Sequence, residues 1–543
     1  MALCMTKLTA CIVAETIEQA ISDIECAQSS GADAVEIRLD YLVSDSDSFG
    51  LREYAKLLEC VKLPVIWTLR HVSEGGRFVG SVEEQLKILA KAIELGGDYV
   101  DMEHRRWEQA DAECKELFIK AIEEIRNSNS ASRDVKLILS FHDFEATPYY
   151  LEDIAKRIGK SDYADVVKVA CKVNNICENF YILDLLDNAN KATIAIGMGE
   201  LGIMSRILAG KFGAEITFAS VRKDKSAAPG QLTIEELKKE YNWNRLNRQT
   251  KLAGVVGHPI GHSLSPVMHN RAYDTMNLNA VYLRFDVSGD YTSFATFLDF
   301  IRERPEYDFI GLSVTIPHKT NAIDYLKANS YKVDVLAEKI GAVNTIVFLP
   351  DGNLAGYNTD YIGVLESLRC VGGLEASELK DKRVAVLGAG GVSRAIVAAM
   401  TFVGAHVTIY NRTERKAQAL ARQFECECES WEERGRIEAD IIINGTSIGM
   451  LGNENSSPLD EDIVRDVIKE GMIVFDTVYN PLETKLLRLA RDRGAEIIDG
   501  ANMLVYQAIE QIKIWLDCWK INYETIPADM MKRAVLAKLG NNR

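Results

Sequence analysis

Eight short β-rich runs fill the first part of the chain, and most neighbouring runs are separated by segments with helical spacing. The runs span 8–14, 34–38, 64–70, 99–103, 136–142, 166–170, 192–197 and 215–220. Segments such as 82–95 and 112–125 show the apolar spacing of amphipathic helices. Eight β–α units in about 240 residues match the size of a (β/α)8 barrel. The sequence therefore predicts an α/β protein that begins with such a barrel over residues 1–240.

The segment 241–251, with the sequence YNWNRLNRQTK, is polar and rich in Asn and Arg. It lacks a regular apolar period, which indicates a linker rather than a core element. A new strand is expected directly after it, at 252–257. Because 543 residues exceed what one hydrophobic core usually supports, two or three domains are expected.

Composition narrows the classes of partner and compartment. A net charge of −16 argues against nucleic acid, since phosphate binding needs basic surfaces. No apolar run approaches the roughly 20 residues of a membrane span. The 11 cysteines show neither a disulfide framework nor zinc spacing, so we expect reduced thiols and no metal site. The first strand begins by about residue 8, which leaves no room for a targeting peptide and favours the cytoplasm. The alternative is a plastid, if a transit peptide has been removed. The oligomeric state stays open, and the sequence is compatible with a monomer.

Charged side chains stand at the ends of successive expected strands. In a barrel, the carboxyl ends of the strands form the rim that carries the chemistry. Because barrel strands are buried on both faces, each of these charges needs a partner or a task. The residues concerned are Glu36, Arg38, Arg70, Glu103, His142 and Lys168.

Lys168 lies inside the apolar run 166–170. Desolvation and nearby arginines would disfavour its ammonium form and favour the neutral amine that attacks a ketone. A lysine extending to a solvated rim is an equally good interpretation of the local sequence. His142, on the neighbouring strand, suits proton transfer near neutral pH. A lysine and a histidine together indicate imine chemistry on a carbonyl compound, either aldol cleavage or elimination β to the carbonyl.

Several motifs of this half, in order, resemble those of type I 3-dehydroquinate dehydratase: SFHDF at 140–144, VVKVA at 166–170, MGELGIMSR at 198–206 and APGQ at 228–231. The resemblance implies that Lys168 forms the imine, that His142 is the acid and base, and that Glu74 orients it. It also implies that the substrate is held by Glu36, Arg38, Arg70, Arg206 and Gln231. The family usually has Ser before APGQ, whereas this chain has Ala227, with Ser226 one residue earlier. This departure predicts a lost substrate hydrogen bond.

In the second half, Ser263 and Ser265 precede Pro266. The favoured interpretation is a helix N-cap, because Ser often caps helices and Pro is common in the first turn. The alternative is a pair of hydroxyls presented to an anionic ligand. Further on, Lys319 and Asp360 follow turn-rich segments and would form a proton-transfer pair if the fold brings them together.

A strand at 383–387 runs into the glycine-rich turn Gly388-Ala389-Gly390-Gly391 and then an expected helix. This is the context of a dinucleotide-binding turn, although position 393 is Ser where Gly or Ala is typical. The next strand ends in Asn411-Arg412-Thr413 rather than in an acidic residue. Arg412, with Lys416, therefore favours NADP through its 2′-phosphate, the alternative being a solvated surface arginine.

These runs resemble shikimate dehydrogenase across essentially the whole second half, including VTIPHK at 314–319, NTD at 358–360, YNP at 479–481 and GANMLVYQ at 500–507. The resemblance implies a substrate-binding domain over 252–358, a Rossmann-like NADP domain over 359–505 and returning C-terminal helices over 506–543. It implies that Lys319 and Asp360 are catalytic and that Asn444, Thr446 and Met503 flank the nicotinamide. The substrate-binding residues that it implies are Ser263, Ser265, Thr315, Asn344 and Gln507. Position 313 is Ser, as in plant fusions, where bacterial members usually have Asn.

Together the two halves resemble the plant-type family of bifunctional 3-dehydroquinate dehydratase/shikimate dehydrogenases. The resemblance implies that 3-dehydroquinate is dehydrated to 3-dehydroshikimate, which NADPH then reduces to shikimate. Three alternatives stay open: a second half that prefers quinate, a non-catalytic ligand-sensing relative, and a class I aldolase fused to a reductase. The intact pairs Lys168/His142 and Lys319/Asp360 weigh against the second, and the SFHDF and APGQ motifs weigh against the third.

Overall fold

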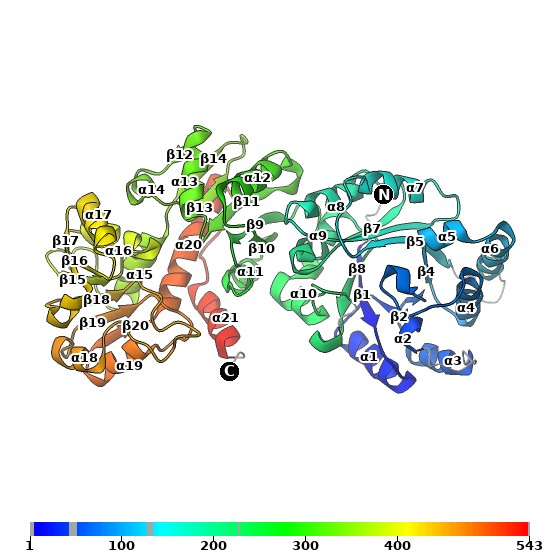
Figure 1. Ribbon diagram of the computed structural model, residues 1–543, viewed down its shortest axis with the longest axis horizontal. Coiled ribbons are helices and arrows are strands. Elements are labelled where there is room, and N and C mark those ends of the chain that lie inside the picture. Colours follow the sequence, from blue (N-terminus) through cyan, green and yellow to red (C-terminus); the bar gives the residue numbers. More distant parts are fainter. Residues whose placement is uncertain (1–4, 43–50, 128–133, 226–227, 541–543) are drawn as a thin grey trace. The chain divides into compact units, whose positions relative to one another are not determined.

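Eight parallel strands form the first unit of the computed structural model, which describes residues 5–42, 51–127, 134–225 and 228–540. Their order is β7-β6-β5-β4-β3-β2-β1-β8. Between the two end strands, the Glu215 N–H donates to the Thr193 carbonyl at 2.9 Å, so the ring is nearly closed. The predicted barrel is confirmed, and the expected runs differ from the observed strands by no more than two residues at either end (Figure 1).

The strands of the barrel are β1 (Lys7–Ile12), β2 (Ala34–Arg38), β3 (Val65–Thr68), β4 (Tyr99–Glu103), β5 (Lys136–Asp143), β6 (Val166–Lys172), β7 (Ala192–Met198) and β8 (Ile216–Ser220). Its helices are α1 (Ile17–Ser29), α2 (Leu39–Leu42), α3 (Leu51–Cys60), α4 (Val82–Leu95), α5 (His104–Gln109), α6 (Ala112–Arg126), α7 (Leu151–Gly159), α8 (Glu178–Asp187), α9 (Ile203–Phe212) and α10 (Ile234–Tyr241). Side chains such as Ile66, Ile138 and Ile194 pack inside the ring, whose amino-terminal part is thereby filled with apolar groups.

The segment after α10, which we expected to be a linker, packs on the barrel unit. The chain divides into two units between Thr250 and Lys251, so this segment belongs to the barrel unit. Trp243 is only 6% exposed and Thr250 is fully buried. The Lys211 ammonium on α9 donates to the carbonyls of Arg248 and Thr250, at 2.9 Å each. The segment is thus held by its backbone carbonyls as well as by Trp243, which is compatible with its polar composition.

The second unit contains two six-stranded sheets. The first, in the order β10-β9-β11-β13-β14-β12, is mixed: β9, β10 and β11 run parallel, and β13 is antiparallel to both β11 and β14. Its strands are β9 (Lys251–Gly257), β10 (Ala280–Asp286), β11 (Phe309–Val314), β12 (Lys332–Val333), β13 (Thr345–Phe348) and β14 (Leu354–Tyr357). Its helices are α11 (Ser265–Thr275), α12 (Tyr291–Arg302), α13 (Lys319–Ala328) and α14 (Val335–Ile340).

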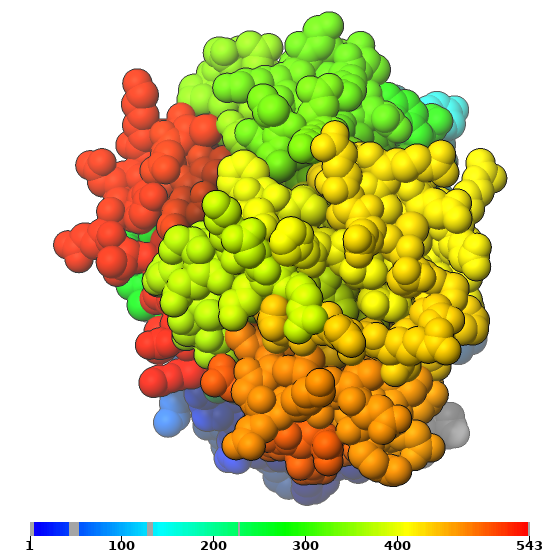
Figure 2. All heavy atoms as spheres, turned by 90° about the vertical axis from the view of Figure 1, so that its left-hand side faces the viewer, coloured from blue at the N-terminus to red at the C-terminus, as the bar shows by residue number. Residues whose placement is uncertain are grey.

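The second sheet, in the order β17-β16-β15-β18-β19-β20, is parallel throughout. Its strands are β15 (Arg383–Leu387), β16 (His406–Asn411), β17 (Glu427–Ser430), β18 (Ile441–Asn444), β19 (Ile473–Asp476) and β20 (Glu496–Ile498). The accompanying helices are α15 (Asp360–Cys370), α16 (Gly391–Phe402), α17 (Glu414–Phe424), α18 (Glu461–Val467) and α19 (Lys485–Asp492). This arrangement confirms the predicted Rossmann-like fold. In the space-filling view its yellow and orange residues form one face, with green residues of the first sheet's lobe beside them (Figure 2).

Two C-terminal helices, α20 (Gly500–Cys518) and α21 (Ala528–Gly540), return to the first sheet's lobe. Helix α20 packs against α15, β11 and β13, while α21 packs against α11. Trp515 of α20 is fully buried, and its indole N–H donates to the Ile346 carbonyl at 3.0 Å. The close approach of this indole requires glycine at position 311, where an added Cβ would lie 2.0 Å from the indole nitrogen.

We therefore expect Gly311→Ala to lower the stability of the second unit by about 1–3 kcal/mol, the usual cost of overpacking a core. Thermal unfolding followed by circular dichroism measures the change. Gly261→Ala is the matched control, because an added Cβ there meets nothing within 4 Å. Equal transition temperatures for the two variants would contradict this account of the α20 interface.

Candidate active sites

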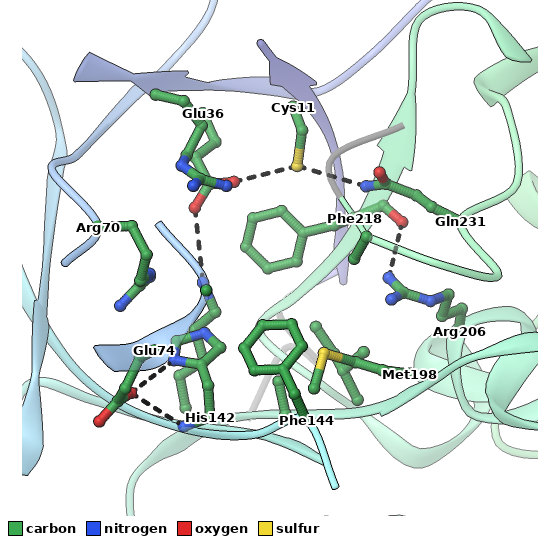
Figure 3. A pocket seen from close by; sticks show the side chains of 16 residues that line it. Cys11, Glu36, Arg70, Glu74, His142, Phe144, Met198, Arg206, Phe218 and Gln231 are labelled. Carbon is green, nitrogen blue, oxygen red and sulfur yellow. Dashed lines mark hydrogen bonds and ion pairs between the residues drawn. The ribbon is translucent and has the colours of Figure 1, made fainter. Parts of the chain in front are cut away.

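One cavity at the carboxyl ends of the barrel strands is bordered by all eight side chains predicted for this half. These are Glu36, Arg38, Arg70, Glu74, His142, Lys168, Arg206 and Gln231. They come from β2, β5, β6, α9 and the segments that follow β3 and β8, so distant parts of the sequence converge here. Figure 3 shows Glu36, Arg70 and Glu74 on one side of the cavity, with Arg206 and Gln231 opposite.

Lys168 is 4% exposed and points into this cavity, so the interpretation as a solvated rim lysine is wrong. Its ammonium lies 2.7 Å from Asp101 Oδ2, 3.5 Å from Glu36 Oε1 and 4.4 Å from the centre of the Phe218 ring. The apolar, arginine-rich surroundings that we expected are therefore joined by two carboxylates. The sequence analysis did not single out Asp101, although an acid in the middle of a buried strand is a signal in itself.

His142 and Glu74 form a hydrogen-bonded pair. Oε2 of Glu74 accepts from both the His142 N–H at 3.1 Å and the ring Nδ1 at 2.9 Å. A carboxylate acceptor at Nδ1 assigns the proton to that nitrogen, which leaves Nε2 as the basic atom. Burial, and then the charges of Arg70 and Lys168, hold the pKa of His142 well below its usual range, so the ring is neutral at pH 7. Burial raises the pKa of Glu74 to about 7.

The arginines of the cavity differ in how their charge is balanced. Arg38 makes two 2.8 Å bonds to Asp40, and Arg70 bonds Asp101 at 2.8 Å. Arg206 is 2% exposed, its Nε has no partner among the described residues, and its Nη1 reaches the Phe218 carbonyl at 3.4 Å. Burial lowers the pKa of Arg206 to about 10. A buried guanidinium so poorly compensated suits an anionic ligand.

Cys11 borders this cavity, whereas Glu103 does not. Cys11 was not predicted, yet its thiol donates to Glu36 Oε2 at 3.0 Å and accepts from Gln231 Nε2 at 3.3 Å (Figure 3). Glu103, noted at a strand end, does not border the cavity; it accepts from the His71 N–H at 2.8 Å and Gln85 Nε2 at 2.6 Å. Ser226 and Ala227 lie outside the described residues.

A second cavity, in the second unit, is bordered by the five residues predicted to bind substrate, the predicted catalytic pair and Met503, which was predicted to bind the cofactor. These are Ser263, Ser265, Thr315, Lys319, Asn344, Asp360, Met503 and Gln507. Lys319, at the start of α13, and Asp360, at the start of α15, form an ion pair, so the fold brings this expected pair together. Asn344 Nδ2 donates to Asp360 Oδ1 at 2.8 Å, which holds the carboxylate toward the lysine.

The interpretation of Ser265 as a helix cap is wrong. Helix α11 starts at Ser265, and the cap position is occupied by Leu264, which makes no side-chain cap bond. The Ser263 hydroxyl instead accepts weakly from the Ser265 N–H at 3.3 Å. Ser265 lies in the first turn of α11 and borders the cavity, and its side chain interacts with that of Tyr282.

A hydrogen-bonded chain that the sequence analysis missed includes Ser313 and Gln511, which border this cavity. Tyr282 donates to Ser313 at 2.6 Å, and Ser313 donates to Gln511 Oε1 at 2.6 Å. Gln511 Nε2 in turn donates to the Asn344 carbonyl at 3.1 Å and to Thr345 Oγ1 at 3.0 Å. Ser313, whose identity departs from the bacterial pattern, therefore connects β10 and β11 with α20.

The residues predicted to hold NADP stand at the carboxyl edge of the parallel sheet. Gly388–Gly391 follow β15, Asn411 to Thr413 end or follow β16, and Asn444 and Thr446 end or follow β18. Because β16, β15 and β18 are neighbours, these turns share one edge. An added Cβ at Gly390 or Gly391 would meet nothing within 4 Å, so the start of α16 is open to a pyrophosphate. Arg412 and Lys416 are exposed at this edge.

Ser393 replaces the third glycine of the motif without strain. It is fully buried, and its hydroxyl donates to the Gly445 carbonyl at 3.2 Å. The compensating feature is Gly445 itself, where an added Cβ would lie 2.5 Å from the Ser393 oxygen. Because position 445 is glycine, α16 can pack closely against the segment after β18 even though position 393 is serine rather than glycine.

Asp476, which was not predicted, holds the side chain of Asn444 at this edge. It is fully buried and accepts from Asn444 Nδ2 at 2.9 Å, the Val478 N–H at 3.0 Å and Thr484 Oγ1 at 2.7 Å. Burial nevertheless raises the pKa of Asp476 to about 6 from 3.8. A carboxyl with a raised folded-state pKa favours folding at low pH and loses that contribution as the pH rises through the folded-state value.

We therefore expect the stability advantage of the wild type over Asp476→Asn to decrease as the pH rises from about 4 to about 6. This advantage is the difference between the free energies of unfolding of the two proteins. Two pKa units correspond to a drop of about 3 kcal/mol. Denaturant unfolding of both proteins between pH 4 and 8 measures this difference. A difference that is independent of pH would show that Asp476 does not titrate in this range.

Comparison with known proteins places these two sites in one family. The model of type I 3-dehydroquinase matches residues 8–248, that of the shikimate dehydrogenase substrate binding domain 255–346, and that of shikimate/quinate 5-dehydrogenase 373–455. Shikimate dehydrogenase (NADP(+)) of Methanosarcina mazei is 38% identical over 53% of this chain and 98% of its own length. The solved shikimate 5-dehydrogenase of Thermus thermophilus, in complex with NADP(H) and shikimate, is 32% identical over 53% of this chain and 99% of its own, with a TM-score of 0.46.

The similarity also extends across both units in a single relative. The bifunctional 3-dehydroquinate dehydratase/shikimate dehydrogenase, chloroplastic, of Arabidopsis thaliana is 35% identical over 93% of this chain and 81% of its own length. In the described part of the chain, no helix is both long and apolar enough to cross a membrane. The chain belongs to the family of bifunctional 3-dehydroquinate dehydratase/shikimate dehydrogenases.

Proposed function

We propose that the barrel dehydrates 3-dehydroquinate to 3-dehydroshikimate through an imine at Lys168, and that the second unit reduces this product to shikimate with NADPH. The observation that carries the proposal is the convergence of Lys168, His142 and the arginines on one cavity. A nucleophilic amine, a neutral base and an anion site are the groups that this elimination requires.

In the barrel, the Lys168 ammonium gives one proton to the ketone oxygen as its amine adds to the ketone carbon. The nitrogen then gives that oxygen a second proton, and the oxygen leaves as water. The nitrogen keeps one proton and becomes a cationic imine. Nε2 of His142 then removes a proton from the neighbouring carbon, whose electron pair moves toward the nitrogen to give an enamine. The enamine expels the hydroxyl β to the imine as water, with the proton returned by His142. Hydrolysis of the imine releases 3-dehydroshikimate and restores Lys168.

The remaining groups of the barrel cavity hold the substrate. Arg206, with its poorly compensated charge, suits the substrate carboxylate. Glu36, Arg38, Arg70 and Gln231 border the same cavity and would bind the ring hydroxyls. Arg38 and Arg70 are each held in place by a buried carboxylate, so ligand binding does not require them to be ordered first.

In the second unit, the Lys319 ammonium would protonate the ketone oxygen, with Asp360 as its partner. Ser263, Ser265, Thr315, Asn344 and Gln507 would bind the substrate. The turn Gly388–Gly391 would hold the pyrophosphate, with Asn444, Thr446 and Met503 beside the nicotinamide. Bound NADPH would supply the hydride to the ketone carbon. The NADP-dependent relative from Methanosarcina mazei supports this choice of cofactor.

We also propose the domain limits 1–240, 252–358, 359–505 and 506–543, with 241–251 as the connection. The matches at 8–248, 255–346 and 373–455 support this order. The substrates are small molecules, and the oligomeric state stays open. For the compartment, the name of the Arabidopsis relative supports the plastid alternative to the cytoplasm.

Substituting each lysine should separate the two activities. Lys168→Ala is expected to abolish borohydride trapping of 3-dehydroquinate and its dehydration, while 3-dehydroshikimate reduction persists. Lys319→Ala should lower reduction by roughly 10²–10⁴-fold and leave dehydration intact. The measurements are mass spectrometry of the trapped protein and the absorbance of each reaction.

The wild type, supplied with 3-dehydroquinate and NADPH, should accumulate shikimate, and turnover of shikimate and quinate with NADP⁺ compares the two candidate substrates. If either lysine variant were folded and had lost both activities, two independent sites would be the wrong description. A folded wild type without turnover would instead favour the ligand-sensing alternative.

Arg412→Ala tests the proposed 2′-phosphate contact. Loss of a charge-assisted hydrogen bond costs about 1.5–3 kcal/mol, so KM for NADPH should rise by roughly 10–150-fold. KM for NADH, which lacks the phosphate, should change little. Arg415→Ala, an exposed neighbour on α17, is the control. Equal effects on both cofactors would indicate that Arg412 is a surface arginine without this role.

A further inference from the structure

We propose that Asp101 is the counterion of the cationic imine at Lys168, and that it keeps this nitrogen protonated while the substrate proton is removed. The inference rests on the proposed function, because it takes imine formation at Lys168 as given. It adds a catalytic residue that neither the strand-end pattern nor the resemblance had identified.

The carboxylate of Asp101 is fixed behind the lysine nitrogen. It belongs to β4, and its side chain is fully buried. Oδ2 lies 2.7 Å from Lys168 Nζ, while Oδ1 accepts from Arg70 Nη2 at 2.8 Å and from the Ser140 hydroxyl at 2.6 Å. Donors on β6, β5 and the segment after β3 thus hold one carboxylate. Asp101 does not border the cavity, so a substrate reaching Lys168 would not displace it.

Glu36 is the other carboxylate near the nitrogen, but its contacts direct it to a different task. It lies 3.5 Å from Lys168 Nζ, compared with 2.7 Å for Asp101. Its oxygens also accept from the Cys11 thiol and from Thr68 Oγ1, at 3.0 Å each. Glu36 borders the cavity, where it faces the substrate. Of the two, Asp101 is therefore the one whose charge stays paired with the nitrogen throughout the reaction.

The charges around this pair favour a permanent anion at Asp101. Burial opposes ionisation of Asp101, yet the charges of Arg70 and then Lys168 hold its pKa well below the usual range. The charged and titratable groups that face the pair from the surrounding elements are Cys11, Glu36, Arg38, Arg70, Glu74, Glu103, His142 and Arg206. Arg70 Nη1 also lies 3.4 Å from Glu103 Oε1, so the charge of Arg70 is divided between two carboxylates. Lys168 is the second cation in contact with Asp101.

The chemistry requires such an anion. A protonated imine accepts the electron pair from the neighbouring C–H bond, whereas a neutral imine accepts it poorly. After addition and loss of water, the nitrogen carries one proton and a positive charge in a desolvated cavity. A fixed anion in hydrogen-bond contact raises the proton affinity of that nitrogen, by the same rule that shifts a pKa by about 1–3 units beside an opposite charge. Asp101 thereby keeps the imine nitrogen protonated, and so able to accept the electron pair, at neutral and mildly alkaline pH.

Asp101→Asn removes the charge and preserves the shape of the side chain. We expect the alkaline limb of the dehydration kcat profile to move about 1–3 pH units lower. Cyanoborohydride, which reduces protonated imines selectively, should still trap 3-dehydroquinate on the variant near pH 6 but lose trapping at a pH where the wild type is still trapped. The rates are normalised to the 3-dehydroshikimate reduction of the same preparation, which depends on the other unit.

Ser140→Ala is the matched control, because it removes a neutral partner of the same carboxylate and leaves the charge in place. Its alkaline limb should coincide with that of the wild type, whatever its effect on the rate. Asp101→Ala provides a second variant: formate, a small anion, should restore the alkaline activity, and the neutral analogue formamide should not. This comparison separates loss of charge from loss of shape.

The outcomes separate the inference from the function on which it rests. If Asp101→Asn kept the wild-type alkaline limb and trapping profile, or if formate failed to rescue a folded Asp101→Ala protein, the counterion role would be overturned. If cyanoborohydride failed to trap the wild type at Lys168, the proposed imine mechanism itself would be wrong.

Discussion

The barrel site depends on offsetting buried positive charge with buried negative charge. Arg38, Arg70 and Lys168 are each less than 10% exposed, and each contacts a buried carboxylate: Asp40 on α2 for Arg38, and Asp101 on β4 for the other two. A single buried cation without such a partner would destabilise the fold by several kcal/mol. Arg206 departs from this rule among the cavity's cations, and it is the one that a substrate anion would complete. Contact with a carboxylate thus distinguishes the cations that the protein itself neutralises from Arg206, which suits an anionic ligand.

The second unit builds its site mainly from neutral groups. Beside the Lys319–Asp360 ion pair, it contains a network of hydroxyls and amides that runs from Tyr282 through Ser313 to Gln511. A neutral network avoids the cost of desolvating charges while it fixes the positions of Asn344 and Thr345. Its members come from β10, β11, β13 and α20, so the returning C-terminal helix is part of the site rather than a cover over it. The buried Trp515 and the glycine opposite it set how closely that helix approaches.

The charged site of the barrel and the mainly neutral site of the second unit left different signals in the sequence. In the barrel, charges within apolar strands were themselves informative, since burial forces each to have a partner or a function. This pattern singled out Lys168 and His142 as candidates, although a solvated rim lysine was an equally good interpretation of Lys168, and their roles came from the resemblance. In the second half, Ser265 looked like a helix cap because serine is common in that position, and the local pattern favoured the wrong interpretation. The glycine turn at 388–391 was predictable because only a strand, a tight turn and a helix in succession produce it.

The order of elements, the barrel and the parallel sheet were determined by sequence alone, because periodicity and burial act over short stretches, whereas most candidate site residues were named through the resemblance. Tertiary structure decided which charges neutralise one another. Asp101 lies 67 positions from Lys168, and no local pattern connects β4 with β6. The docking of 243–250 on α9 and the support of Asn444 by Asp476 also depend on contacts between distant segments. Electrostatic pairing in a desolvated interior depends on distance in space, and this is the information that a linear sequence does not contain.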